Sequence, residues 1–170
     1  MQIFLMGFMG SGKSTIGKIL ADKLNYEFLD LDAQIEKNEK RSIEKIFQTE
    51  GEAYFRKVEA KALNNLKKRK NRVVSLGGGT PCYSNNMFII SKLGTPVYIQ
   101  TSQDRLVQNL SKDQNKRPLL KGLNKVRLKT KIGSMLRART SFYNKANYKI
   151  RNNASPERIA ERIRNKLDLD

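Results

Sequence analysis

Several kinds of sequence feature are missing from this chain of 170 residues, and each absence narrows the class of protein. The single cysteine, Cys82, cannot form an internal disulfide, which indicates a reducing compartment. No apolar run approaches the roughly 20 residues that a membrane-spanning helix needs. The apolar residues 1–10 have no Lys or Arg before them, so they do not have the form of a signal peptide. We therefore expect one cytoplasmic domain over residues 1–170, without repeats or low-complexity segments.

Acidic residues are scarce relative to basic ones. Sixteen Asp and Glu stand against thirty-four Lys and Arg, which gives a net charge of +18. This balance fits proteins that bind nucleic acids or anionic membranes, and equally enzymes whose ligands are all anions. The densest cluster, residues 67–70, ends a predicted helix over residues 52–70, where cations are favoured by the helix C-terminus. Neither aromatic interleaving nor zinc-ligand spacing supports specific nucleic-acid recognition.

The most informative stretch is residues 7–14, GFMGSGKS, which fits the P-loop pattern G-x-x-x-x-G-K-[ST]. Residues 3–6 before it are typical of a buried strand, and apolar residues recur at helical spacing over residues 15–24 after it. In this context the loop N–H groups and the positive helix N-terminus bind phosphate. Lys13 would reach the β- and γ-phosphates, and the Ser14 hydroxyl would hold Mg²⁺. The pattern predicts a nucleoside triphosphate site.

The rest of the chain alternates predicted strands with predicted helices. The strands are expected at residues 3–6, 26–29, 72–76, 95–99 and 148–150. This alternation implies an α/β fold with a parallel sheet that is covered by helices on both faces. Residues 111–124 are polar and without periodicity, and a loop of that length inside a compact domain is often a lid.

Two carboxylates and three glycines follow predicted strands. Asp30 and Asp32 come at the sheet end where open α/β folds bind ligands. With the P-loop on the neighbouring strand, one would hold Mg²⁺ through water and the other would orient an acceptor hydroxyl. Alone, the pair would equally well cap the next helix; beside a P-loop we favour the functional interpretation. Residues 77–79 are all glycine, which would let the backbone approach a ligand closely.

Three arginines are harder to assign from spacing alone, because any arginine on so basic a surface is solvated by default. Arg117 lies in the predicted lid, directly before Pro118. Arg56 shares a predicted helix with Glu59, which is three residues on and could hold its guanidinium group. Arg139 lies on a later basic helix.

The order and spacing of these motifs resemble the shikimate kinases over nearly the whole chain. The resemblance rests on residues 7–17, 28–32, 51–59, 75–79 and 117–120, and on Arg139 four residues before Tyr143. It implies a three-layer α/β/α P-loop kinase fold with a five-stranded parallel sheet and a mobile lid. It also implies transfer of the γ-phosphate of ATP to the 3-hydroxyl of shikimate, with Mg²⁺ as the cofactor.

The resemblance assigns roles to individual residues. The ATP phosphates would be bound by Gly10, Ser11, Gly12, Lys13, Ser14, Thr15 and Arg117. Mg²⁺ would be held by Ser14 and, through water, by Asp30. Shikimate would be bound by Asp32, Arg56, Gly78, Gly79 and Arg139, in a pocket lined by Phe47 and Phe55. The residues expected to act in catalysis are Lys13, Asp32 and Arg117.

One departure from the family pattern concerns the nucleotide base. The family usually carries an arginine just before the lid that stacks on adenine, and here no arginine lies between Arg105 and Arg117. Two other functions remain open at this point: a related P-loop kinase of a small polyol acid such as gluconate, and a P-loop nucleic-acid-binding protein. We expect a monomer that binds ATP and shikimate, with no membrane and no specific nucleic-acid partner.

Overall fold

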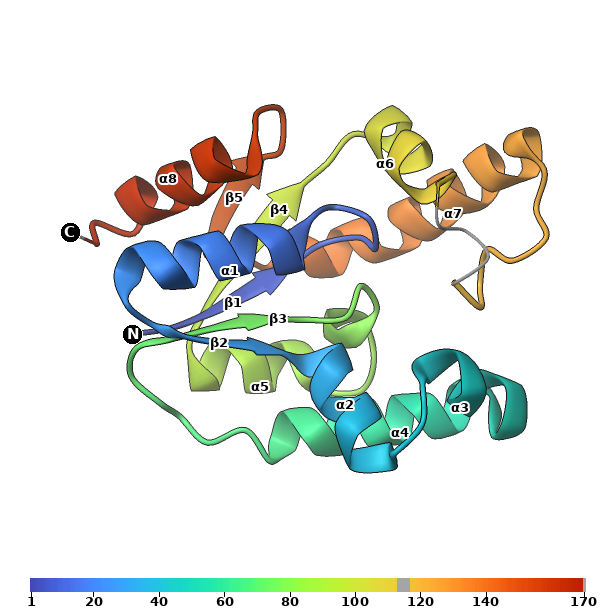
Figure 1. Ribbon diagram of the computed structural model, residues 1–170, viewed down its shortest axis with the longest axis horizontal. Helices are drawn as coiled ribbons and strands as arrows, with labels where there is room; N and C mark the ends of the chain where they lie inside the picture. Colours follow the sequence, from blue (N-terminus) through green and yellow to red (C-terminus); the bar gives the residue numbers. More distant parts are fainter. Residues whose placement is uncertain (113–116, 170) are drawn as a thin grey trace.

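A computed structural model describes residues 1–112 and 117–169 of the chain. Its strands are β1 (Gln2–Met6), β2 (Glu27–Asp30), β3 (Arg72–Ser75), β4 (Thr95–Gln100) and β5 (Tyr148–Arg151). Its α-helices are α1 (Lys13–Leu24), α2 (Leu31–Glu39), α3 (Ile43–Thr49), α4 (Gly51–Asn64), α5 (Asn86–Leu93), α6 (Gln103–Leu110), α7 (Lys125–Tyr143) and α8 (Pro156–Lys166). A short 3₁₀ helix, η1, spans Thr80–Cys82. The strands form one sheet in the order β2-β3-β1-β4-β5, and every neighbouring pair is parallel (Figure 1). The predicted five-stranded parallel sheet is confirmed.

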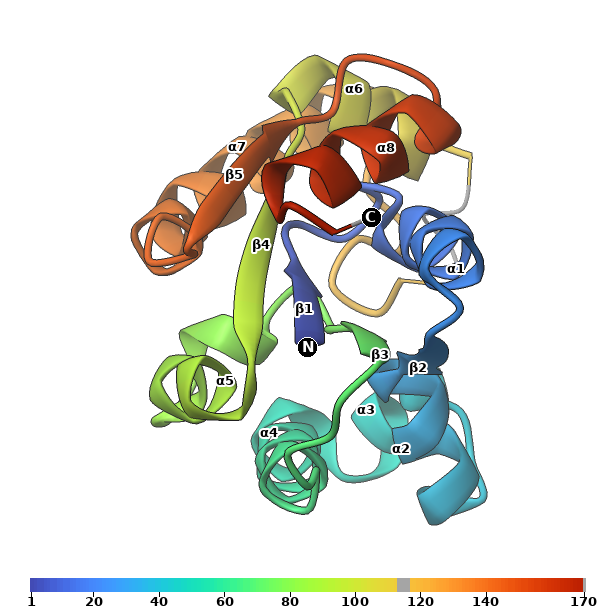
Figure 2. The same ribbon diagram turned by 90° about the vertical axis from the view of Figure 1, so that its left-hand side faces the viewer.

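Helices cover both faces of the sheet, because successive side chains of a strand point to opposite faces. In β1, Ile3 and Leu5 pack with α1 and α8, whereas Phe4 and Met6 belong to a second cluster with the remaining α-helices. Figure 2 shows α1 and α8 together on one side of the strands and α4, α5 and α7 on the other. The result is a three-layer α/β/α arrangement.

The carboxyl ends of the three strands that carry the predicted motifs lie at the same edge. Leu5 of β1 pairs with Ser75 of β3, and Ser75 pairs in turn with Asp30 of β2. The prediction that the P-loop strand and the Asp30 strand are neighbours was therefore wrong, since β3 lies between them. The consequence is that the glycine segment after β3 enters the centre of the site.

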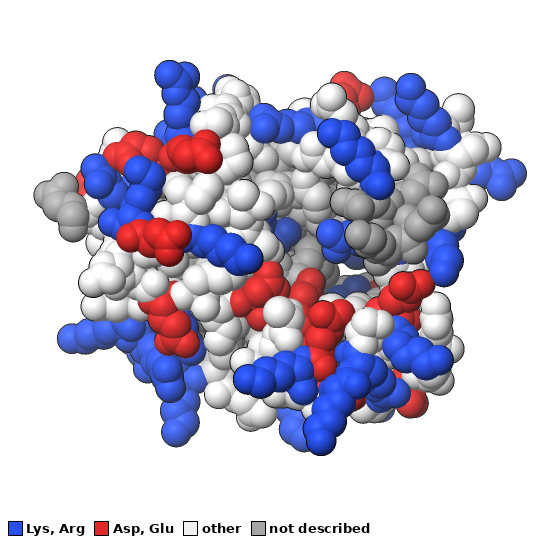
Figure 3. All heavy atoms as spheres, viewed as in Figure 1, with Lys and Arg blue, Asp and Glu red and all other residues white. Residues whose placement is uncertain are grey.

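Helix α4 is shorter than predicted. It ends at Asn64, with Asn65 as its C-cap, so residues 67–70 lie in the link to β3 and not at a helix end. The link is anchored where Arg69 N–H donates to Gln2 Oε1 and the buried Arg72 guanidinium donates to the Lys67 carbonyl. The four cations of this link are exposed. Figure 3 shows Lys and Arg side chains spread around the periphery of the face in view, without one continuous basic stripe.

Local geometry defines where two of the shorter helices begin. The N-cap of α6 is Ser102, whose hydroxyl accepts from Arg105 N–H. Helix α5 begins at Asn86, because Ser84 has a positive φ of 50° that is incompatible with a helix start. In the predicted lid, the described residues on either side of 113–116 form turns, with Leu120 N–H donating to the Arg117 carbonyl; residues 113–116 lie outside the described part of the chain. Among the described helices, none is long and apolar enough to cross a membrane.

Candidate active site

The P-loop has the strand–loop–helix form that phosphate binding requires. It connects β1 to α1, whose N-cap is Gly12 with a φ of 79°, a backbone conformation that favours glycine. Lys13 is only 7% exposed, and its Nζ donates to the Phe8 carbonyl at 2.9 Å. Burial lowers the pKa of Lys13 to about 8, and the negative charge of Asp32 opposes that shift. The ammonium group is thus held inside the loop.

A cavity of about 320 Å³ lies against this loop. Its walls include Gly10, Gly12, Lys13, Ser14, Thr15 and Arg117, all predicted to bind ATP phosphates. Ser11 does not line it: its side chain is fully buried, and its carbonyl accepts from Asn152 Nδ2 at 2.8 Å. The end of α6 packs on the loop, since Asn109 Nδ2 donates to the Gly10 carbonyl.

Three oxygen-bearing side chains meet at the end of β2 and β3. Ser14 Oγ donates to Asp30 Oδ2 at 2.5 Å and lies 3.2 Å from Ser75 Oγ. Asp30 is also the N-cap of α2, where its other oxygen accepts from Asp32 N–H and Ala33 N–H. Asp30 therefore caps a helix, as one of the two interpretations has it, and it also lies against the P-loop serine.

These oxygens fit a magnesium ion. Mg²⁺ prefers hard oxygen ligands, and it usually takes one or two carboxylates with the phosphates of its substrate. Among the described residues there is no cluster of three or more Asp, Glu, Cys or His side chains that could hold a metal alone. Ser14 and Asp30 thus fit an ion that arrives with a nucleotide.

Asp32 lies one residue into α2 and faces the same space. Its Oδ1 is buried without a hydrogen-bond partner, and burial together with the charges of Glu59 and Asp30 raises its pKa to about 6. At neutral pH the group is a carboxylate with a proton affinity above that of an ordinary aspartate. Such a group can accept a proton from a bound hydroxyl.

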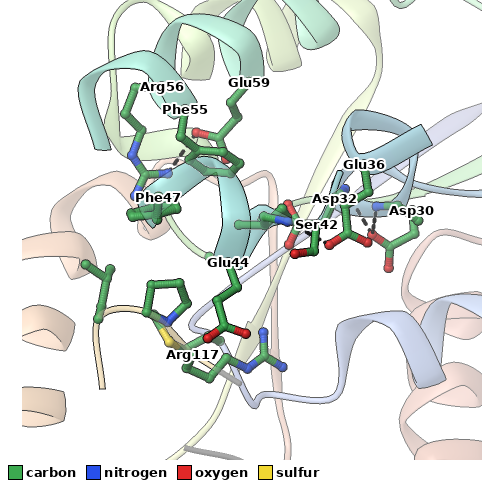
Figure 4. Close-up of a pocket in the computed structure, with 18 of the residues that line it drawn as sticks. Asp30, Asp32, Glu36, Ser42, Glu44, Phe47, Phe55, Arg56, Glu59 and Arg117 are labelled. Carbon is green, nitrogen blue, oxygen red and sulfur yellow. Dashed lines mark hydrogen bonds and ion pairs between the residues drawn. The ribbon is translucent and has the colours of Figure 1, made fainter. Parts of the chain in front are cut away.

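A second cavity, of about 540 Å³, opens beside the P-loop cavity (Figure 4). Asp32, Phe47, Phe55, Arg56, Gly78, Gly79, Arg117 and Arg139 all line it, as the resemblance implies for an acceptor pocket. Ser14, Asp30, Asp32, Gly78 and Arg117 line both cavities. Helices α2 and α3 contribute Glu36, Ser42 and Glu44, which the sequence analysis did not identify.

Arg56 and Arg139 differ in how they are held. Arg56 forms ion pairs with Glu52 at 2.8 Å and with Glu59 at 2.9 Å, and its side chain is 11% exposed. Arg139 is 7% exposed, its guanidinium carbon lies 5.4 Å from the centre of the Phe8 ring, and its Nη1 is buried without a hydrogen-bond partner. The nearby Tyr143 hydroxyl donates to the Gly78 carbonyl. Arg139 therefore lies in the cavity wall with one guanidinium nitrogen buried and unpartnered.

The three glycines lie tightly against other parts of the site. A Cβ on Gly77 would lie 2.7 Å from Asp32 Oδ1, one on Gly78 would lie 2.8 Å from the Met9 N, and one on Gly79 would lie 2.6 Å from Arg56 Nη1. At Gly78 the neighbour is backbone, whereas at Gly77 and Gly79 the side chain of Asp32 or Arg56 would have to shift. The sequence interpretation, close approach to a ligand, thus omits a larger reason: side chains and backbone of the site occupy this space.

The fold and the P-loop site together define a P-loop phosphotransferase with two adjoining cavities. The family model described as shikimate kinase matches residues 9–168. A shikimate kinase from Sulfurihydrogenibium sp. (strain YO3AOP1) is 41% identical over 98% of this chain and 97% of its own, and one from Azobacteroides pseudotrichonymphae genomovar. CFP2 is 43% identical over 85% and 86%. The chain belongs to the shikimate kinase family.

Solved structures agree with this assignment. Shikimate kinase from Bacteroides thetaiotaomicron superposes with a TM-score of 0.92 at 35% identity, covering 99% of this chain and 98% of the other. Shikimate kinase from Acinetobacter baumannii in complex with shikimate gives a TM-score of 0.90 at 35% identity, covering 98% and 93%. The three-layer α/β/α P-loop kinase fold is confirmed.

Proposed function

We infer that this protein is an ATP-dependent shikimate kinase, which transfers the γ-phosphate of ATP to the 3-hydroxyl of shikimate and yields shikimate 3-phosphate and ADP. One observation carries the assignment beyond family membership. Asp32 Oδ1 and Arg139 Nη1 are buried without partners, and both residues line the same cavity. Buried polar atoms are almost always hydrogen-bonded, so a fitting ligand offers a donor, such as a hydroxyl, and an acceptor, such as a carboxylate. Shikimate, a cyclic hydroxy acid, has both.

We propose that the two cavities divide the substrates between them. The phosphates of ATP would lie against Gly10, Gly12, Lys13, Ser14 and Thr15. Ser14 and Asp30 would hold Mg²⁺, which when bound would supply positive charge beside the transferred phosphoryl group. Shikimate lies between Arg56 and Arg139 at its carboxylate and Asp32 at its hydroxyl. Arg117 borders both cavities and contributes positive charge where they meet.

Asp32 has the central role in the transfer. Its carboxylate orients the attacking hydroxyl toward the γ-phosphorus and takes up the hydroxyl proton as the new O–P bond forms and the bond to ADP breaks. Lys13 stabilises the negative charge of the transferred group and of the leaving phosphate. An assay of ADP release with shikimate, with gluconate and without acceptor tests this function. ADP release with gluconate alone, or at equal rates in all three, would contradict it.

We further propose that residues 1–170 act as one domain and as a cytoplasmic monomer. The single core of two clusters on one sheet supports the first statement, and the single cysteine supports a reducing compartment. Closure of residues 111–124 over ATP stays a prediction. ATP and shikimate are both anions, which partly explains the excess of Lys and Arg without a nucleic-acid partner.

Replacing Arg139 by lysine should raise KM for shikimate about tenfold or more while changing KM for ATP less than twofold. Lysine keeps the charge but loses the planar fork that binds a carboxylate through two hydrogen bonds. Steady-state kinetics with each substrate varied in turn measures the two KM values separately. Arg137→Lys, on the same helix and outside both cavities, is the matched control. Equal losses for both substrates would contradict the proposed division.

We expect GTP to support turnover within about tenfold of ATP. The last arginine before the lid, Arg105, donates to the carbonyls of Asn152 and Ala154 at 2.8 and 3.2 Å and is therefore engaged in holding the β5–α8 loop. A base without a cation–π partner loses about one decade of affinity at most, and the phosphate contacts are common to all nucleotides. The exposed Lys112 is the residue that would compensate. The measurement is kcat/KM for ATP and GTP in the wild type and in Lys112→Ala; a preference for ATP above a hundredfold in both would contradict the expectation.

A further inference from the structure

Tyr83, at the end of η1, contacts Arg56 of the proposed acceptor pocket from outside the cavity. Its hydroxyl donates to Glu52 Oε1 at 3.0 Å. The same carboxylate oxygen accepts from Arg56 Nε at 3.2 Å and from Arg56 Nη2 at 2.8 Å. The guanidinium carbon of Arg56 lies 4.1 Å from the centre of the Tyr83 ring, closer than to the Phe55 ring at 5.1 Å. Tyr83 thus holds Arg56 twice, through Glu52 and through its ring.

The donors of Arg56 can be counted. A guanidinium group has five N–H bonds. Two are taken by Glu52, and one on Nη1 is taken by Glu59 at 2.9 Å. One N–H therefore remains on each of Nη1 and Nη2, the pair of nitrogens that can bind a carboxylate in a bidentate manner. Both nitrogens lie against Gly79, at the cavity wall.

The orientation of this remaining pair depends on what fixes the plane of the guanidinium group. The side chain of Glu52 is 39% exposed and begins the first turn of α4, so by itself it is a weakly fixed anchor. The Tyr83 hydroxyl restrains this carboxylate, and the ring limits rotation of the guanidinium plane. Preorganisation of this kind lowers the cost of ordering a side chain when a ligand binds.

We propose that Tyr83 is a positioning residue for the acceptor carboxylate, acting through Glu52 and Arg56 without touching the substrate. This inference rests on the proposed function. The contributions of the Tyr83 hydroxyl and of its ring can be separated by substitution. Tyr83→Phe removes the hydroxyl alone, whereas Tyr83→Leu removes the hydroxyl and the aromatic face.

Tyr83→Phe should raise KM for shikimate about fivefold, and Tyr83→Leu about thirtyfold, because the second also loses the cation–π contact. KM for ATP and kcat should stay within twofold in both variants. Thermal unfolding establishes that each variant is folded, and Tyr83→Phe alone suffices if the leucine variant is not. A change in KM for shikimate below 1.5-fold in Tyr83→Phe would overturn the proposal.

The chain offers a matched control. Tyr54 makes the same kind of trio, in which its hydroxyl donates to Glu39 Oε2 at 3.1 Å and Arg41 lies 5.5 Å from its ring centre. Arg41 also donates to Glu39 Oε2. None of these three residues lines either cavity. Tyr54→Phe should leave KM for shikimate unchanged, and an equal rise in both tyrosine variants would overturn the proposal.

Two readouts separate positioning from a general structural role. In a Glu52→Ala background the Tyr83 hydroxyl has no partner, so Tyr83→Phe should have less than a twofold further effect. With shikimate methyl ester as acceptor, the effect of Tyr83→Phe should also fall below twofold, because the ester lacks the carboxylate. Undiminished effects in either experiment would overturn the proposal. Wild-type enzyme without shikimate-dependent ADP release would overturn the proposed function itself, whereas an active wild type with an indifferent Tyr83→Phe would overturn this inference alone.

Discussion

Asparagine in place of Asp32 should lower kcat about a thousandfold or more and at the same time make the fold more stable. General base catalysis contributes roughly 10²- to 10⁴-fold, and an amide cannot accept the hydroxyl proton. The wild-type carboxylate is desolvated and lies near Glu59 and Asp30, which raises its pKa to about 6. Holding it ionised in the folded state therefore costs about 3 kcal/mol at pH 7, a cost that the neutral amide does not have.

The sign of this effect gives the experiment its pH window. An acid whose folded pKa is raised destabilises the fold above its unfolded pKa of about 3.8, increasingly up to pH 6, and by a constant amount beyond. The stability gain of Asp32→Asn should thus be present at pH 7 and absent near pH 4 in chemical unfolding. In the wild type, kcat/KM should fall below pH 6 as the base is protonated. Near-normal kcat in Asp32→Asn at saturating shikimate would show that Asp32 is neither base nor orienting group.

Alanine in place of Lys13 should lower kcat/KM about a thousandfold without loss of folding. One preorganised donor to the transition state is worth about 10²- to 10³-fold, and Lys13 is also a full charge beside the phosphates. Its side chain serves no hydrophobic cluster, and its ammonium group makes contacts within the loop only to Phe8 and Ser11. Removing a buried cation whose pKa is already lowered to about 8 should not destabilise the protein.

Lys18 gives the matched control for this substitution. It lies on the same helix, is exposed, and contacts only the Phe28 ring among the interactions that the structure defines for it. Lys18→Ala should therefore keep wild-type turnover in the same coupled assay. Substantial activity in Lys13→Ala, with a folded protein, would contradict the assignment of the P-loop as the site of phosphoryl transfer.

The sequence alone predicted the layers of the fold well, because the hydrophobic periodicity that forms strands and helices is local. The strand order could not be predicted in this way, because it depends on tertiary structure. After β2 the chain passes through α2, α3 and α4, and β3 then lies between β1 and β2. The end of α4 was missed for a similar reason. Ala60, Leu63 and Leu66 continue a helical pattern, but the chain must leave the helix at Asn64 to begin β3 at Arg72.

The residues of the candidate site also differ in whether local sequence could predict them. The P-loop residues were predictable because they are contiguous, and Asp32, Arg56, Arg117 and Arg139 were placed by family resemblance and do line the cavities. Ser75, Tyr83 and Glu36 carried no signal, since a serine in a strand or a tyrosine after a turn is ordinary on its own. Their contacts with Ser14, with Glu52 and with the Ile43 amide depend on tertiary placement.

The crowding around residues 77–79 determines where acceptor selectivity can be redesigned. A side chain added at Gly78 would collide with the P-loop backbone, and one added at Gly77 or Gly79 would displace Asp32 or Arg56, so substitutions at these positions should lower activity before they change specificity. Substitutions should be better tolerated at Ser42 and Glu44 of the α2–α3 region, because these residues line the larger cavity and do not line the P-loop cavity. Directed evolution toward bulkier or less oxygenated acids should therefore accumulate its productive changes in that region.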